Sequence, residues 1–306
     1  TGWPGGKPDA DDSQRPERAL PAKKRSIIFS PHPDDDVISM GGTFIRLVDQ
    51  GHDVHVAYQT SGNTAVWDDD VLRYMEFAID FNHSIGDDNT HLKNLYEDMR
   101  TFLAQKQPNQ IDTQEIRDVK GFIRKTEAIS GARYAGLDDD HIHFQALPFY
   151  ETGKTQKSPV TDKDIELTME LLQKIKPQQV FVAGDFADPH GTHLVCFNIV
   201  IAALRKLRAT EDWVKDCWVW MYRGAWKEFD TYEIEMAVPL SPQEVLRKRN
   251  AIFKHQSQKD RAVFPGDDAR EFWVRAEDRN RETAQAYDRL GLAEYQAMEA
   301  FVRFHY

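Results

Sequence analysis

The sequence predicts an α/β fold, with a mostly parallel β-sheet and helices on both of its faces. Short apolar runs typical of strands alternate with longer segments that have helical periodicity. A strand at 26–30, a helix at 40–50 and a second strand at 54–58 form the first such unit. Gly51 stands where a helix C-cap is expected. A strand–helix–strand unit of this kind implies parallel strands joined by a right-handed crossover.

The first 22 residues have the composition of a linker or an extended arm. They are rich in Pro, Gly, Asp and Arg, with scarcely an apolar residue between Trp3 and Leu20. We therefore expect the folded domain to span 23–306. Because the chain begins with Thr1 and not Met, we expect an excised domain, or a product from which a leader or an upstream domain has been removed.

A polar, irregular segment around 63–112 interrupts the alternation of strands and helices. It is longer than an ordinary loop, so we interpret it as an insertion that decorates the sheet. We expect two helices within it, at about 71–81 and 92–105.

Strand and helix signals alternate again after the insertion. The expected strands are 142–144, 180–183, 217–221 and 233–238, and the expected helices are 113–134, 161–176, 193–207 and 242–255. Thr161 and Ser241 are N-cap residues of two of these helices, and Pro242 suits a first helical position. The last third of the chain is expected to be helical.

Charge and apolar content exclude several classes of partner. The 50 acidic and 39 basic residues give a net charge of -11, which repels nucleic acid and anionic lipid headgroups. No apolar run approaches the roughly 20 residues that cross a bilayer. Cys196 and Cys217 lie in apolar stretches that indicate core positions and not a disulfide framework, so a reducing cytoplasm is favoured.

One imidazole and three carboxylates directly follow the first predicted strand. They lie in the segment 30–36, Ser-Pro-His-Pro-Asp-Asp-Asp, at a strand end where ligands bind in open α/β sheets. They supply nitrogen and oxygen ligands suited to zinc or a similar divalent ion, with a carboxylate left over. The alternative is a turn in which Pro33 and the aspartates cap the next helix.

A second polar segment, Asp-Pro-His-Gly-Thr-His at 188–193, follows the strand 180–183 in the same position. His190 and His193 are three residues apart at the opening of a helix, so they can face one cavity. Two ligands from the first segment and one from the second would complete the three that a catalytic zinc usually takes. The alternative is a pair of surface or core histidines.

These segments resemble the two motifs of the PIG-L/LmbE-like deacetylases, and the resemblance runs from about Ser26 to Gln258. It implies a Rossmann-like fold, a bound Zn²⁺ ion and removal of an acetyl group from an N-acetylglucosamine-type sugar. By motif position, the resemblance implies three metal ligands, a general base and a group that stabilises the oxyanion. These are, in that order, His32, Asp35 and His193 as ligands, Asp34 as the base and His190 as the stabilising group.

Two further segments match the family less closely. Arg124 begins an Arg-Lys-Thr-Glu segment similar to the family's Arg-x-x-Glu helix, where a guanidinium can bind sugar hydroxyls or a phosphate. The segment His-Gln-Ser-Gln at 255–258 resembles a late Ser-Gln element, which would place His255 at the substrate site. The alternatives are a solvated helix charge and a plain helix end.

The sequence also departs from the family pattern. Thr192 stands where the family usually has an Asp that supports a charged histidine, which leaves the charge state of His190 open. Asp188 is close enough in sequence to take that part. Asn63 replaces an acidic residue after the turn 60–62, so substrate contacts there are expected to differ.

Alternatives to the sugar deacetylase follow from these departures. One is hydrolysis of a different amide, such as one on an antibiotic-like or thiol–sugar conjugate. The other is a catalytically impaired sugar-binding module. The insertion, with its aromatic and acidic side chains, is expected to form part of the rim that selects the substrate. The first six residues are similar to the join in bacterial proteins where a glucosamine-6-phosphate-deaminase-like domain precedes a PIG-L domain.

Overall fold

A computed structural model describes residues 22–306 except 155–156, 260–262, 265–267 and 269. The arm expected at 1–22 therefore lies, apart from its last residue, outside the described residues. None of the helices in the described part of the chain is both long and apolar enough to span a bilayer. Cys196 and Cys217 are free and buried, as their apolar surroundings predict.

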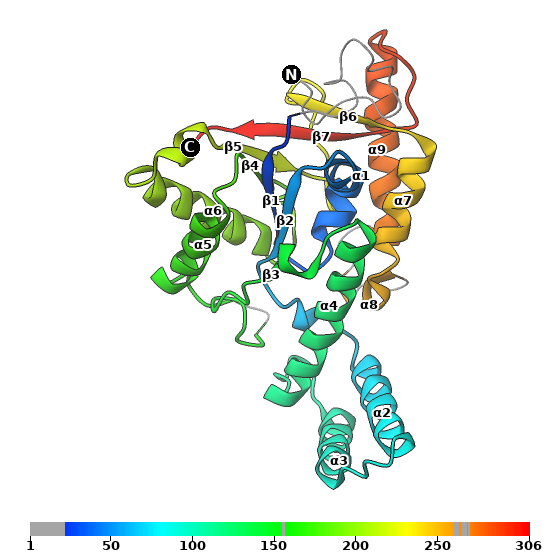
Figure 1. Ribbon diagram of the computed structural model, residues 1–306. Helices are drawn as coiled ribbons and strands as arrows, with labels where there is room; N and C mark the ends of the chain where they lie inside the picture. The colour runs from blue at the N-terminus through cyan, green and yellow to red at the C-terminus, as the bar shows by residue number, and fades with distance from the viewer. Residues whose placement is uncertain (1–21, 155–156, 260–262, 265–267, 269) are drawn as a thin grey trace.

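A seven-stranded sheet with the strand order β3-β2-β1-β4-β5-β7-β6 lies at the centre of the fold (Figure 1). Its first five strands pair in parallel, whereas β7 is antiparallel to both of its neighbours, β5 and β6. This arrangement confirms the mostly parallel sheet. The strands are β1 Arg25–Ser30, β2 Asp53–Tyr58, β3 Ile142–Phe144, β4 Gln179–Ala183, β5 Trp218–Tyr222, β6 Met236–Leu240 and β7 Ala297–Phe304.

Helices cover both faces of the sheet, and the insertion projects from one end of it (Figure 1). Helices α2 and α3 belong to the insertion and pack on each other and, through α2, on α4. The helices are α1 Asp35–Asp49, α2 Asp68–Ser84, α3 Thr90–Gln105, α4 Gln114–Tyr134, α5 Asp162–Ile175, α6 Thr192–Arg208, α7 Pro242–Ile252, α8 Gln256–Lys259 and α9 Phe272–Arg289.

The alternation of side chains along the central strands produces two cores. Ile28 of β1 packs in a core shared with α1, α4, α7 and α9, whereas Ile27 and Phe29 pack in a core shared with α5 and α6. Successive residues of a strand point to opposite faces, so a strand buried on both faces is a continuous apolar run. The run from Ile27 to Phe29 therefore fixes β1 in the middle of the sheet.

Helix α1 is broken at Met40, where φ is -131° and ψ is 26°. The buried carboxylate of Glu299, in β7, accepts hydrogen bonds from the backbone N–H groups of Gly42 at 2.9 Å and Thr43 at 2.6 Å. It also accepts one from Nζ of Lys248 at 2.7 Å. The first N–H groups of a helix have no partner within the helix, so a carboxylate that accepts their hydrogen bonds stabilises the helix start. Glu299 thus caps the second half of α1 from the opposite end of the sequence.

The prediction that the last third of the chain is helical was wrong for residues 297–304. This segment, Ala-Met-Glu-Ala-Phe-Val-Arg-Phe, starts with good helix formers but is strand β7. Its first five residues are all buried because it lies between two other strands, and this burial overrides local propensity. Smaller differences are a first helix that begins at Asp35 and not at 40, a helix α7 that ends at Ile252, and a strand β6 that is shifted by up to three residues toward the C-terminus.

Candidate metal centre and active site

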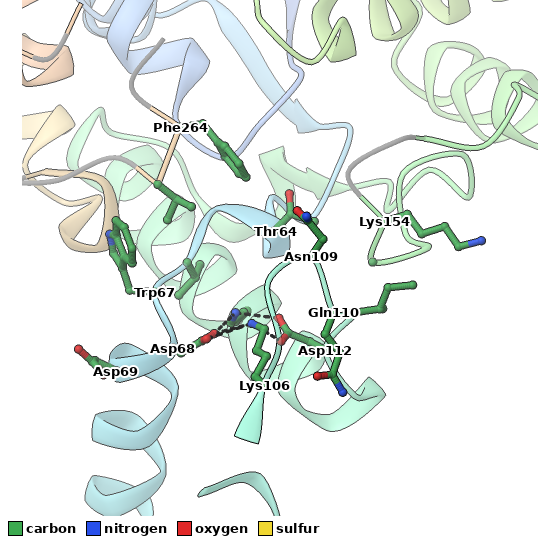
Figure 2. Close-up of a pocket in the computed structure, with 15 residues that line it drawn as sticks. Thr64, Trp67, Asp68, Asp69, Lys106, Asn109, Gln110, Asp112, Lys154 and Phe264 are labelled. Carbon is green, nitrogen blue, oxygen red and sulfur yellow. Dashed lines mark hydrogen bonds and ion pairs between the residues drawn. The ribbon is translucent and has the colours of Figure 1, made fainter. Parts of the chain in front are cut away.

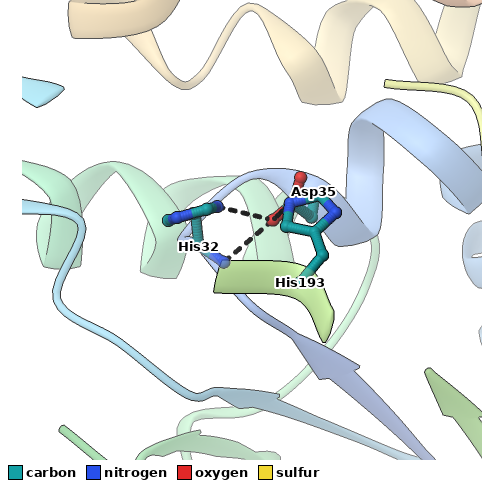
Figure 3. Close-up of side chains that lie close together, drawn as sticks. All are labelled: His32, Asp35 and His193. Atoms are coloured by element: carbon teal, nitrogen blue, oxygen red, sulfur yellow. Dashed lines mark hydrogen bonds and ion pairs between the residues drawn. The ribbon is translucent and has the colours of Figure 1, made fainter. Parts of the chain in front are cut away.

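The two predicted segments meet because β1 and β4 are neighbours in the sheet. Oδ2 of Asp35 lies 3.1 Å from Nδ1 of His32 and 3.2 Å from Nε2 of His193 (Figure 3). Ligand atoms about 2.1 Å from a tetrahedral metal ion are roughly 3.4 Å apart. The three side chains therefore lie close enough together to share one divalent ion.

The start of α1 positions the first two of these residues. Asp34 is the N-cap residue of α1 and Asp35 lies in its first turn. The backbone N–H of His32 donates a hydrogen bond to Oδ2 of Asp35 at 2.9 Å. Burial disfavours the charged form of Asp35, but His193 and His32 outweigh it and hold the pKa of this carboxyl well below its usual range. Asp35 is therefore a carboxylate at any ordinary pH.

His193 is oriented by the backbone that follows β4. Its Nδ1 lies 3.0 Å from the carbonyl oxygen of Asp185, so Nδ1–H donates there and Nε2 faces the Asp35 carboxylate. Burial disfavours a charged imidazole, but the Asp35 carboxylate raises the pKa of His193 to about 9. A proton and a divalent ion therefore compete for the same buried Nε2 atom.

Asp188 lines the smaller of the two cavities described below, and its carboxylate also shapes the start of α6. Its carboxylate accepts hydrogen bonds from the backbone N–H groups of His190, at 2.7 Å, and His193, at 2.9 Å. The backbone positions of His190 and His193 are thereby fixed relative to Asp188. Thr192, where the family usually has Asp, is buried, and its Oγ1 makes no hydrogen bond to any described residue.

His190 lies at the edge of the site and is neutral. Its ring packs edge-on against Phe264, with 4.4 Å between centroids. Burial lowers the pKa of His190, and the Asp188 carboxylate only partly opposes this effect. The buried Nε2 of His190 makes no hydrogen bond within the described part of the chain.

A buried ion pair lies beside the candidate ligands. Nη2 of Arg124, on α4, is 3.0 Å from Oδ1 of Asp34, and the two residues are 1% and 5% exposed. Burial raises the pKa of Asp34, and the Arg124 guanidinium opposes that rise. The sequence alternative of a solvated charge at Arg124 is therefore wrong.

Two neighbouring cavities lie at the site, and they share two lining residues. The smaller, about 70 Å³, is lined by His32, Asp34, Asp35, Arg124 and His190, among others. The larger, about 590 Å³, shares Thr64 and Phe264 with it and extends along the insertion (Figure 2). Lys106 and Lys120 in the larger cavity are both paired with Asp68 and Asp112.

Three predicted site residues do not line the smaller cavity: His193, Asn63 and His255. Nδ2 of Asn63 lies 3.4 Å from Oε2 of Glu151, and Asn63 lines a separate cavity of about 380 Å³. His255 is 1% exposed and packs against Gly131, whereas Gln258 of the same segment lines the smaller cavity. Substrate contacts by Asn63 and His255 stay predictions.

Some residues of the site carried no recognised signal in the sequence. Asp185 orients His193 through its carbonyl group, and its carboxylate accepts from the backbone N–H groups of Trp226 and Lys227 at 2.6 and 2.9 Å. Its place two residues after β4 was a usable signal. Trp226 and Phe272 line the smaller cavity but come from distant segments with no local pattern.

Comparison with known proteins agrees with this geometry. Residues 27–204 match the family described as PIG-L, GlcNAc-PI de-N-acetylase. A putative glucosamine-6-phosphate deaminase-like protein of Bacteroides thetaiotaomicron is 56% identical over 99% of this chain, which spans 46% of that protein. The chain thus covers about half the length of this curated relative.

Solved structures share the fold at low sequence identity. The N,N'-diacetylchitobiose deacetylase of Pyrococcus horikoshii has a TM-score of 0.56 and 19% identity, over 92% of this chain and 84% of that chain. The 4-carboxy-2-hydroxymuconate hydratase of Pseudomonas putida has a TM-score of 0.57 and 14% identity, over 92% and 97%. This fold therefore carries more than one reaction, and the likeness establishes the fold alone.

The matched segment contains both histidine motifs and the strands that bring them together, from β1 to most of α6. Together with the α/β sheet, this match supports a deacetylase. The chain belongs to the PIG-L family of de-N-acetylases.

Proposed function

We propose that the chain is a zinc-dependent deacetylase that hydrolyses the acetamide group of an N-acetylated, sugar-like substrate. The observation that carries this proposal is the convergence of the ligand atoms of His32, Asp35 and His193, two of which, His32 and Asp35, also line the smaller cavity. Asp34 and His190 lie beside that point, on separate loops. Family membership supports the amide as the bond that is cleaved.

The donor set suits a catalytic zinc ion. Two imidazoles and one carboxylate leave a position open for water or substrate. The buried Nε2 of His193, which faces the Asp35 carboxylate at 3.2 Å, is the atom through which this histidine would bind such an ion. When bound, zinc supplies a Lewis acid that lowers the pKa of water to about 7 and polarises the amide carbonyl.

Asp34 is the residue that we assign as general base. Its carboxylate takes a proton from the attacking water and later passes a proton to the leaving nitrogen. Burial and the Arg124 ion pair act on its pKa in opposite directions, with a net rise. A carboxylate with a raised pKa binds the transferred proton more strongly than an exposed aspartate does.

His190 is the residue that we assign to the oxyanion. The acetyl oxygen gains negative charge as water attacks the carbonyl carbon, and a positioned donor stabilises that charge. Burial lowers the pKa of His190 and so favours the neutral ring, and in the proposed role that ring carries its proton on the buried Nε2 and donates it to the oxyanion. This assignment does not need the aspartate that Thr192 replaces.

The sizes of the two cavities support a substrate larger than a free acetamide. The smaller cavity, about 70 Å³, holds a group of acetyl size, whereas the larger cavity, about 590 Å³, holds a ring system. Trp67 and the ion-paired Lys106 and Lys120 line the larger cavity. An aromatic face with hydrogen-bonding neighbours suits a sugar ring, so we propose that the insertion selects the substrate.

The full-length protein is proposed to carry a deaminase-like domain ahead of this one. The chain spans 46% of its Bacteroides thetaiotaomicron relative, whose printed name is deaminase-like. An amino sugar freed of its acetyl group would have the chemistry that such a domain handles. An alternative function is hydrolysis of another amide that fits the larger cavity.

The test is release of free amine from a panel of N-acetylated sugars by the zinc-loaded chain. The panel contains N-acetylglucosamine, its 6-phosphate and N,N'-diacetylchitobiose, with an antibiotic-like acyl amide for the alternative. We expect turnover of at least one sugar, its loss in Asp34→Asn, and its loss after chelation with recovery on added zinc. Tight sugar binding without amine release would favour the impaired sugar-binding module.

A further inference from the structure

A second cluster of metal-ligating side chains lies at the far end of the sheet from the candidate active site. Asp53 and His55 belong to the start of β2, and His141 and His143 lie at the start of β3. The strands pair in parallel, with Ala57 opposite His143. Since alternate residues of a strand share a face, this register places the four side chains on one face of the sheet edge.

Three ligand atoms converge in this cluster. Oδ1 of Asp53 lies 3.3 Å from Nε2 of His55 and 3.2 Å from Nε2 of His141, and all three atoms lie within 4.8 Å of one another. These spacings are close to the 3.1 and 3.2 Å found at the candidate active site. They also approach the roughly 3.4 Å between ligand atoms of a tetrahedral metal.

The fourth residue is placed to orient one of these ligands. Nδ1 of His55 and Nε2 of His143 are 3.1 Å apart, and the two rings are stacked. When Nδ1–H of His55 donates to His143, Nε2 of His55 is left with a lone pair that faces Asp53. A histidine ligand whose other nitrogen donates a hydrogen bond is the usual arrangement at metal sites.

The chemistry of the cluster selects among cations. Two imidazoles and one carboxylate favour zinc and similar transition metals over Mg²⁺ or Ca²⁺, which prefer oxygen ligands. The positive charge of Lys174, on α5, acts on His55 and His143 and would repel a bound cation. The negative charge of the Asp53 carboxylate opposes this repulsion. The side chains of His55, Asp53 and His141 are 14%, 28% and 34% exposed, so an ion can reach them from solvent.

We infer that Asp53, His55 and His141 form a second, structural zinc site, with His143 as the residue that orients His55. An ion there joins β2 to the 3₁₀ turn that precedes β3, Asp139–His141. Strand β3 has three residues and lies at the end of the strand order. Zinc at this site would therefore stabilise the pairing of a short edge strand and would take no part in catalysis.

The test uses a background that lacks the first site, so that the outcome does not depend on the proposed function. The complete 306-residue chain with the His193→Ala substitution is freed of metal with a chelator. It is then titrated with Zn²⁺ by calorimetry, with Mg²⁺ as a control cation. We expect about one equivalent of bound zinc, no response to Mg²⁺, and a rise in Tm with zinc, because the ion binds the folded state.

Added variants in this background locate the site. His141→Ala should abolish the bound equivalent and the zinc-dependent rise in Tm, whereas His143→Gln should weaken zinc binding by about 10- to 100-fold. His91→Ala, an exposed histidine in the insertion, should bind zinc as the parent does. Circular dichroism before titration shows which variants are folded.

Three results would overturn the inference: no zinc bound by the His193→Ala variant, undiminished binding after His141→Ala, or equal loss in His91→Ala. In otherwise unchanged chain, His141→Ala should lower the zinc content from about two equivalents to about one while amine release persists. If the wild-type chain released no amine from any substrate, that result would count against the proposed function. It would not affect the zinc titration that tests the second site.

Discussion

Nη2 of Arg124 lies 3.0 Å from Oδ1 of Asp34, and this ion pair forms part of the wall of the smaller cavity. The two residues come from α4 and from the N-cap position of α1, so the pair joins the segment after β1 to a helix on one face of the sheet. The partner that stabilises the charged form of Asp34 is therefore a second residue on which the proposed reaction depends.

Replacing Arg124 should impair both stability and turnover. Arg124→Gln leaves a buried carboxylate without its cation, which costs roughly 3–5 kcal/mol in proteins. Without the opposing guanidinium, the pKa of Asp34 should rise further, so the acidic limb of the pH–rate profile should move to higher pH. Arg124→Lys should restore part of both effects. An unchanged profile in a folded Arg124→Gln variant would contradict the assigned role of the pair.

The general base and the metal ligands should separate experimentally. Asp34→Asn should lower kcat by about 10²- to 10⁴-fold, the usual contribution of general acid–base catalysis, with zinc content unchanged. His193→Ala should lower zinc content and activity together. Elemental analysis beside an amine-release assay distinguishes the two. If Asp34→Asn lost metal as readily as His193→Ala does, Asp34 would be a ligand and not the base.

His255 should make the chain sensitive to acid. Burial, assisted by Arg124, lowers the pKa of His255 to about 3, whereas an unfolded histidine has a pKa near 6.5. Between those pH values the unfolded state binds the extra proton, so the free energy of unfolding falls as pH decreases from about 6.5 toward 3. The protonation of His255 contributes on the order of 5 kcal/mol to this change across the whole interval.

Denaturant unfolding at several pH values tests this prediction. His255→Asn should flatten the dependence of unfolding free energy on pH between about 6.5 and 4. His91→Asn, in an exposed position of α3, should leave the dependence unchanged and serves as the matched control. If the unfolding free energies of His255→Asn and wild type changed equally with pH, His255 would not titrate as its burial implies.

Breaking the buried pair of Lys248 and Glu299 should lower the free energy of unfolding substantially. Nζ of Lys248 donates to Glu299 at 2.7 Å and to Oδ1 of Asn280 at 2.8 Å. Lys248→Met leaves the Glu299 carboxylate buried with only backbone donors, so we expect a loss of roughly 3–5 kcal/mol in urea unfolding. Breaking the exposed pair of Glu97 and Arg100 by Glu97→Gln should leave the urea unfolding midpoint almost unchanged.

Trp67 should affect large substrates more than small ones. Because Trp67 lines the larger cavity and not the smaller one, Trp67→Ala should raise KM for a disaccharide substrate with little effect on an N-acetylated monosaccharide. Loss of one aromatic contact is worth about 1 kcal/mol or more, which is roughly a fivefold change in KM. A uniform effect on all substrates would exclude a selective role of the insertion.

The sequence predicted the parts of the fold that local patterns specify. The run from Ile27 to Phe29 is apolar without alternation, as expected of a strand buried on both faces, and Ser241 with Pro242 marks the start of α7. Strand β7 could not be predicted in this way. Its environment comes from β5 and β6, which are distant in sequence, and Glu299 within it pairs with Lys248 of another element.

The candidate site likewise contains residues that local patterns predicted and residues that only the tertiary structure places there. His32, Asp35 and His193 lie in two short segments at the ends of neighbouring strands, so strand order alone brings them together. Trp226 and Phe264 reach the cavity from irregular segments, and their positions depend on packing that no periodic pattern encodes. The Asp53 and His141 cluster was likewise missed, because a register between β2 and β3 is needed to place these residues side by side.

The link between Glu299 and the break in α1 has a consequence for how the domain matures during translation. Strands β1, β2 and β4 emerge from the ribosome early, yet the carboxylate that completes the first helix is encoded near residue 300. Until then, β5 and β6 lack their shared neighbour and expose unpaired edges. Nascent chains of this domain should therefore depend on chaperone protection until β7 has left the ribosome.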